Sequence, residues 1–297
     1  MNMETLKASL YDEKVKKIIL DTDCYNEIDD QFALAYAMLS PDKVKLLSIN
    51  AAPFLNSRST SAGDGMEKSY QEIFRIMKLV DPNADIPVYR GSTAFLTNKE
   101  TPVESPACDN IINTVMNSDE TVYVVAIGAI TNVASAIIKC PEIVNRMVVV
   151  WLGGHALHWQ DTKEFNLRQD VAAAQIIFDS KVPFVQIPCN GVCTEFLTTI
   201  PELEYYLRGK NELCDYLVDI VSHYTKKPYG WSKVVWDVTA VAALVMPSAL
   251  DMVIIPTPVL TSDCHYAKDD ARHPYIYIRH IRRDPLYGDL FAKLANK

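Results

Sequence analysis

The chain has 297 residues, of which 49% are hydrophobic and 22% charged, as is ordinary for a globular protein. Its formal net charge of −8 argues against a nucleic-acid partner, because proteins that bind the phosphate backbone present a basic face. No apolar run reaches the length of about 18 residues that a membrane span needs, and seven cysteines without CxxC spacing favour reduced thiols in a cytoplasmic protein.

Apolar strands and helices alternate along the chain, after a polar N-terminus that predicts no signal peptide. We expect strands at 15–20, 43–52, 85–91, 121–129, 146–154 and 182–188. We expect helices at 31–39, 66–80, 132–139 and 170–179, and a loop leading into a buried helix over 235–246. The basic segment 278–284 is interpreted as a solvated strand edge. The alternation predicts an α/β fold, with a mostly parallel, Rossmann-like sheet flanked by helices on both faces, in a single domain over residues 1–297.

Four aspartates lie within ten positions at the end of the first predicted strand: Asp21, Asp23, Asp29 and Asp30. In a parallel sheet the ligand site lies beyond the carboxyl ends of the strands, which is where these carboxylates fall. Helix capping explains Asp29 and Asp30, but it does not explain why Asp21 and Asp23 converge on them from the strand. A divalent cation would relieve the repulsion among all of them, and oxygen ligands favour calcium or magnesium over zinc.

Two other segments are expected to face the same crevice. Thr131 and Asn132 lie where a predicted strand gives way to a helix, so a backbone carbonyl there can point toward the aspartates. Asp237 follows an aromatic residue at the mouth of an apolar helix. Taken alone, Asp237 is also well placed to be a helix N-cap.

The sequence resembles the calcium-dependent nucleoside hydrolases of the inosine–uridine-preferring type. Their first strand ends in a DxDPGxDD-like motif, and this chain has DTDCYNEIDD at 21–30. Further blocks similar to the family follow in the family's order: DIPVYRG, VYVVAIGAITNVASAI, VVVWLGG, EFNLRQDVAAAQIIF and WDVTAVAALV. The resemblance covers residues 15–245 and implies hydrolysis of the N-glycosidic bond of ribonucleosides, with calcium as the cofactor and an oxocarbenium-like transition state.

The resemblance also implies a role for each matching residue. The calcium ligands would be Asp23, Asp30, the backbone carbonyl of Thr131 and the side chain of Asp237. Asp23 would in addition take a proton from the attacking water. The residues that hold the sugar hydroxyls would be Asp29, Glu164, Asn166 and, by a looser alignment, Asn56. The family further suggests a homodimer or a homotetramer that acts on a small-molecule nucleoside.

Three departures from the family pattern leave the base preference open between purine and uridine. The acidic motif is two residues longer than usual, so Asn26 or Glu27 could reach the sugar or alter the metal coordination. Trp236 stands where inosine–uridine-preferring enzymes have a histidine that helps the base to leave. A tryptophan there resembles the purine-preferring branch, in which stacking raises the proton affinity of the base, while a tryptophan that only fills the crevice wall is the alternative. The segment 92–112 lacks the family's histidine–glycine pattern.

Other readings of the sequence stay open. The strand end ILDTD resembles that of haloacid-dehalogenase-like phosphatases, although Tyr25 stands where that chemistry needs threonine or valine. The chain could instead act on another ribosyl or glycosyl compound, or bind calcium and sugar without nucleosidase activity. The histidines lack ligand spacing and are interpreted as surface or packing residues. His155 and His158 are the two singled out for a possible role, because they lead directly into the sugar-binding segment.

Overall fold

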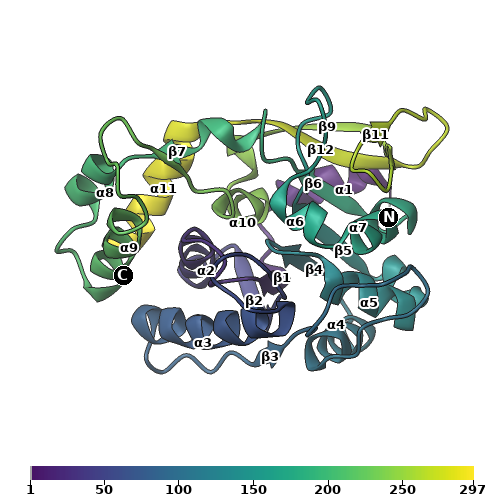
Figure 1. The fold of residues 1–297 in the computed structure, drawn as a ribbon, viewed down its shortest axis with the longest axis horizontal. Coiled ribbons are helices and arrows are strands. Elements are labelled where there is room, and N and C mark those ends of the chain that lie inside the picture. The colour runs from purple at the N-terminus through teal and green to yellow at the C-terminus, as the bar shows by residue number, and fades with distance from the viewer. Residues whose placement is uncertain (1) are drawn as a thin grey trace.

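An eight-stranded sheet forms the centre of the computed structural model, which describes residues 2–297 (Figure 1). Its strands are β1 (Lys16–Thr22), β2 (Val44–Ala51), β3 (Val88–Arg90), β4 (Val122–Ala126), β5 (Met147–Leu152), β6 (Phe184–Ile187), β9 (Leu250–Pro256) and β12 (Pro274–Ile281). They are arranged in the order β3-β2-β1-β4-β5-β6-β12-β9, and only β9 runs antiparallel to its neighbour. The first six follow the Rossmann order, so the switch point, where ligands bind in such sheets, lies between β1 and β4.

Helices cover both faces of this sheet. The α-helices of residues 2–297 are α1 (Met3–Leu10), α2 (Asp30–Met38), α3 (Ala62–Val80), α4 (Pro106–Met116), α5 (Thr131–Lys139), α6 (Phe165–Gln169), α7 (Val171–Asp179), α8 (Ile200–Tyr206), α9 (Glu212–Ser222), α10 (Val238–Val245) and α11 (Arg283–Ala295), of which α9 packs on α3, α8 and α11 rather than on the sheet. Helix α2 packs against α3, α10 and α11, while α5 packs against α4 and α7 on the other side (Figure 1). Two short antiparallel ribbons complete the fold: β7 (Leu197–Thr198) with β8 (Lys233–Val234), and β10 (Val259–Leu260) with β11 (Tyr266–Ala267).

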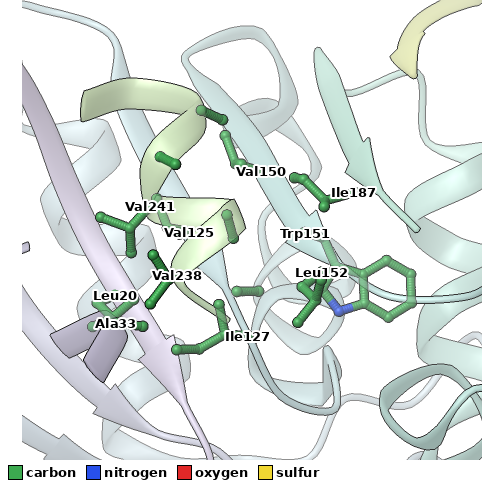
Figure 2. Packing of buried hydrophobic residues seen from close by; sticks show 14 of the residues in the cluster. Leu20, Ala33, Val125, Ile127, Val150, Trp151, Leu152, Ile187, Val238 and Val241 are labelled. Atoms are coloured by element: carbon green, nitrogen blue, oxygen red, sulfur yellow. The ribbon is translucent and has the colours of Figure 1, made fainter. Parts of the chain in front are cut away.

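Helix α10 is apolar on every side because it is buried on every side. Figure 2 shows Val238 and Val241 of this helix beside Leu20 of β1 and Val125 of β4. All four side chains are inaccessible to solvent. This packing holds the start of α10 next to the end of β1, and the residue that precedes α10 is Asp237.

The α/β fold class and the Rossmann-like sheet are confirmed, and the six predicted strands correspond to β1 to β6 with shifts of a few residues at their ends. The extent of the domain, residues 1–297, stays a prediction. The interpretation of 278–284 as a strand edge was right only in part: residues 278–281 pair with β9 and not with β6, but Arg283 already begins α11. Arg279 and His280 are exposed, as expected for a solvated segment. Within residues 2–297 no helix combines the length and the apolar character needed to cross a bilayer.

An aromatic cluster on the α7 side of the sheet gives the first prediction. The ring of Phe178 is fully buried and lies near the rings of Trp151, Phe184, Tyr266 and Tyr275. We expect Phe178→Ala to lower the free energy of unfolding by about 3 to 5 kcal/mol, because it leaves a cavity that rigid neighbours cannot fill. Urea denaturation measures the change, with Tyr229→Ala at a fully exposed position as the control. Equal stabilities of the two variants would contradict this account of the core.

Candidate active site

Carboxylates from three segments meet at the switch point between β1 and β4. Asp21 lies within β1 and Asp23 directly beyond it, and both are completely buried. Asp30 is the first residue of α2, and Asp237 immediately precedes α10, which packs against α2. One carboxylate oxygen from each of Asp29, Asp30 and Asp237 lies within 4.8 Å of the other two. The packing of two helices against β1 therefore concentrates carboxyl groups in a largely buried region beside a pocket.

Helix capping does not account for these carboxylates. Asp29 and Asp237 occupy the N-cap positions of α2 and α10, but neither side chain makes a capping hydrogen bond. Elsewhere in the chain capping is ordinary, as at Ser61, whose hydroxyl accepts from the backbone N–H of Asp64. Asp29 and Asp237 therefore stand at the helix starts without capping them, and the free backbone N–H groups of α2 and α10 do not engage their oxygens.

The carboxyl groups destabilise one another's charged forms. Burial, followed by the charges of Asp30 and Asp29, raises the pKa of Asp23 well above its usual range. Burial and the charge of Asp29 raise the pKa of Asp30 to about 7, although the Thr22 hydroxyl donates to Asp30 Oδ1 at 2.5 Å. The charge of Asp30 in turn raises the pKa values of Asp23 and Asp237. Without a cation, these groups can coexist only by holding protons.

Asp21 and Asp23 have different roles although they are two positions apart. Asp21 Oδ2 accepts a hydrogen bond from Asn132 Nδ2 at 2.9 Å, and the same amide reaches the carbonyl oxygen of Ala51. Burial raises the pKa of Asp21 to about 7. Asp23, in contrast, receives no hydrogen bond at either carboxylate oxygen. Asp21 therefore ties β1 to the start of α5, whereas Asp23 is left for a ligand.

The oxygen atoms available in this cluster suit a divalent cation that prefers hard oxygen ligands. Neither of the two buried carboxylate oxygens of Asp23 accepts a hydrogen bond, and this costs free energy unless a ligand binds to them. Asp30 and Asp237 add further carboxylate oxygens, which are the ligands that calcium and magnesium prefer. The acidic cluster can therefore hold a metal ion, as the sequence predicted.

Asp29 is fixed by a neighbouring segment. Its Oδ2 accepts from the backbone N–H of Trp236 at 2.9 Å, and its Oδ1 lies 3.4 Å from the ammonium of Lys233. Lys233 also forms an ion pair with Glu27. Burial alone would lower the pKa of Lys233, but the charges of Asp29 and Glu27 outweigh it and raise that pKa. A buried, charged lysine thus lies beside the acidic cluster.

A pocket opens next to these carboxylates. The predicted site residues that line it are Asn26, Asp29, Glu164, Asn166, Trp236 and Asp237. Asp23 and Asp30 are buried and are not among the residues that line the pocket. The remaining lining residues are Glu27, Ile127, Leu152, His155, Phe165, Cys189 and Asn190. The pocket therefore joins polar groups that can hold hydroxyls to apolar groups that can contact a ring.

Glu164 and Asn166 come from the turn that begins α6. Glu164 is the N-cap, and its carboxylate accepts from the backbone N–H groups of Gly154, Asn166 and Leu167 at 2.8 to 3.0 Å. Asn166 donates from Nδ2 to the carbonyl oxygens of Ile127 and Leu152, at the ends of β4 and β5. The amide oxygen of Asn166 is then the atom that can accept from a ligand.

Asn56 supports the long acidic loop from behind. Its Nδ2 donates to Asn26 Oδ1 at 2.6 Å, and Asn56 is not among the residues that line the pocket. Arg58 donates to the carbonyl oxygen of Glu27 at 2.6 Å. A direct contact between Asn56 and a sugar stays a prediction, because the structure connects Asn56 to the pocket through Asn26.

Thr131 is the first residue of α5, and its hydroxyl donates to Asp170 Oδ2 at 2.7 Å. Gly128 lies closer to the acidic cluster, since a Cβ added there would come within 2.9 Å of Asp23 Cγ. The indole N–H of Trp151 holds the Gly128 carbonyl at 3.1 Å, and Ile127 lines the pocket. The chain before Thr131 thus passes directly over Asp23, and calcium coordination by the Thr131 carbonyl stays a prediction.

His155, one of the two histidines singled out before the sugar-binding segment, lines the pocket and also contacts Asn190. Its Nδ1 accepts from the backbone N–H of Asn190 at 3.3 Å, and burial lowers its pKa. His155 follows Gly153 and Gly154 at the end of β5, and this position at a strand end is a second reason to expect it at the site.

Comparisons with known proteins agree with this architecture. A family model described as inosine-uridine preferring nucleoside hydrolase matches residues 18–273. The non-specific ribonucleoside hydrolase RihC of Escherichia coli is 28% identical over 263 residues, covering 77% of this chain and 79% of RihC.

Two solved structures show the same fold. The purine-preferring ribonucleoside hydrolase from Gardnerella vaginalis has a TM-score of 0.76 at 22% identity, over 95% of this chain and 98% of that chain. The plant nucleoside hydrolase PpNRh1 has a TM-score of 0.78 at 18% identity, over 96% of this chain and 100% of that chain. Because the family model matches most of the chain, this protein is an N-glycosyl hydrolase that belongs to the inosine-uridine preferring nucleoside hydrolase family.

Proposed function

We propose that the protein is a calcium-dependent hydrolase that cleaves the N-glycosidic bond of purine or uridine ribonucleosides and releases the free base and ribose. The observation that carries this proposal is Asp23, whose two carboxylate oxygens are buried without a donor beside other buried carboxylates. The ribonucleoside hydrolases among the relatives support a ribonucleoside as the substrate.

The calcium ligands in this proposal are the side chains of Asp23, Asp30 and Asp237 and the carbonyl of Thr131. The three carboxylates have the hard oxygens and the negative charge that calcium prefers. Thr131 enters on the family resemblance alone. When bound, calcium would hold the 2′ and 3′ hydroxyls of the ribose and lower the pKa of a water molecule next to Asp23.

The chain's own residues then supply proton transfer, orientation and charge stabilisation. Asp23 removes a proton from the attacking water. Asp29, Asn26, Glu164 and Asn166 line the pocket and hold the sugar hydroxyls, which fixes C1′ near that water. As the glycosidic bond breaks, positive charge develops on the sugar, and the surrounding carboxylates stabilise that charge more than they stabilise the neutral substrate.

Trp236 is proposed to contact the leaving base. It lines the pocket next to Asp237, while its backbone N–H holds Asp29. Stacking of the indole on a purine would favour protonation of the base and so help it to leave. The alternative is that Trp236 only forms a wall of the pocket. Stacking predicts that the effect of replacing Trp236 depends on the base of the substrate, whereas a wall predicts no such dependence.

A second candidate function is hydrolysis of a different ribosyl or glycosyl compound. The observation that favours it is Glu27, a charged residue of the longer acidic loop that lines the pocket. Calcium-dependent sugar binding without cleavage would use the same polar groups. A homodimeric or homotetrameric assembly and a cytoplasmic location stay predictions from the sequence.

The role of Asp23 gives a direct test. We expect Asp23→Asn to lower kcat for ribonucleoside cleavage by about 10²- to 10⁴-fold, because an amide cannot accept the proton of the attacking water. Chromatography of the free base measures the rate over a panel of ribonucleosides. Asp85→Asn, at an exposed position, is the control and should retain wild-type turnover. Turnover of Asp23→Asn within tenfold of wild type would show that Asp23 is not the base.

Calcium is expected to stabilise the protein most at alkaline pH. The pKa of Asp30 is raised from 3.8 to about 7 in the metal-free fold, so its protonation stabilises that fold at low pH, and this contribution is lost as the pH rises through about 7. Calcium at about 100 times its Kd adds about 2.7 kcal/mol, which corresponds to about 4 °C in Tm for a chain of this length.

Thermal denaturation with calcium or with EDTA should therefore show a larger difference in Tm at pH 8 than at pH 5. Magnesium in place of calcium tests the choice of metal. Equal Tm values with calcium and with EDTA at both pH values would argue against a metal site formed by these carboxylates.

Trp236 can be tested by comparing two bases. We expect Trp236→Ala to lower kcat/KM for inosine by about 10- to 100-fold, since stacking on a base contributes about 1 to 3 kcal/mol. Trp236→Phe should retain more of the activity because it keeps an aromatic face. Uridine cleavage should fall less than inosine cleavage. An equal loss for both nucleosides would favour the role of Trp236 as a wall of the pocket.

A further inference from the structure

Lys233 is a buried cation in the wall of the candidate active site. It lies on β8, four positions before Asp237, and is only 6% exposed. Lysine is seldom buried unless its charge is compensated, because desolvating an ammonium is costly. Here Glu27 and Asp29 both contact the ammonium. Glu27 and Asp29 flank Ile28 in the acidic loop, so one lysine joins two acids of that loop.

The longer acidic loop is held in place independently of Lys233. Its backbone carbonyls accept hydrogen bonds from Gln31 Nε2, which reaches Cys24 at 2.8 Å, and from Arg58, which reaches Glu27 at 2.6 Å. Asn56 holds the side chain of Asn26 at 2.6 Å. The loop therefore presents Glu27 at a defined place at the edge of the pocket, where its side chain is 37% exposed.

Asp29 depends on the segment that carries Lys233. Trp236 N–H binds one carboxylate oxygen and the Lys233 ammonium approaches the other, so both oxygens are oriented from 233–236. A carboxylate oxygen can accept more than one hydrogen bond, so each still has a lone pair for a sugar hydroxyl. The Asp29 side chain makes no capping bond, so without Lys233 the Trp236 N–H alone would hold one of its two oxygens.

We propose that Lys233 is a positioning residue for substrate binding, which orients Asp29 toward the sugar, and that Glu27 of the longer loop keeps Lys233 in place. This inference rests on the proposed function, because it assigns Asp29 to the sugar hydroxyls. It also explains why the acidic motif is two residues longer, since the longer loop carries Glu27, the second acid that contacts Lys233.

The test compares Lys233→Met, which removes the charge, with Lys233→Arg, which keeps it. We expect Lys233→Met to raise KM for a ribonucleoside by about 10- to 100-fold, the change expected when a charge-assisted contact is lost. Lys233→Arg should stay closer to wild type. Glu27→Gln should raise KM in the same direction by a smaller factor. Lys227→Met, at an exposed position of the preceding loop, is the matched control and should be unchanged.

The measurements are made with saturating calcium, well below the Tm of each variant, so that loss of folded protein does not enter KM. Calorimetry of D-ribose binding to the same variants provides a readout that does not need turnover. A KM of Lys233→Met within threefold of wild type would overturn the inference, and so would equal impairment of the methionine and arginine variants. Wild-type protein that binds ribose but cleaves no nucleoside would instead overturn the proposed function, and the ribose affinities would still test the role of Lys233.

Discussion

Buried negative charge at the end of β1 is the constraint on which the rest of this structure depends. Two unit charges 4 Å apart repel by about 4 kcal/mol at an effective dielectric constant of 20, and several carboxylates meet here. The cost is offset by apolar packing, since α10 and α2 are buried against the sheet and bring Asp237 and Asp30 together. Hydrophobic burial in the core thus holds in place an arrangement that the charges alone would disperse.

In the same region, Asp21 and Asp23 differ in whether their carboxylates accept hydrogen bonds. Asp21 is bound by the amide of Asn132, which also contacts β2, so this acid strengthens the connection between strands. Asp23 has no such partner. Because a buried carboxylate that accepts no hydrogen bond is costly, Asp23 is the group expected to bind a ligand, whereas Asp21 contributes to the fold.

The pocket is built from strand ends that are linked to one another. Asn166 joins β4 to β5 through their terminal carbonyls, and Trp151 holds the turn at Gly128 beside Asp23. Lys233 connects the acidic loop to the segment that leads into α10. These contacts place polar groups in fixed positions before a substrate arrives, which reduces the reorganisation needed for a reaction.

The sequence by itself determined the alternation of strands and helices, because buried apolar runs and amphipathic periods are local properties of the chain. It also determined the acidic motif and the ordered blocks that indicate the family. Only the tertiary structure decided that Asp29 and Asp237 do not cap their helices, that His155 enters the pocket, and that β12 lies inside the sheet. Only the tertiary structure shows that Lys233 contacts Glu27, although the two residues are 206 positions apart in the sequence. Such contacts depend on how loops from distant segments pack together, and local periodicity carries no information about that packing.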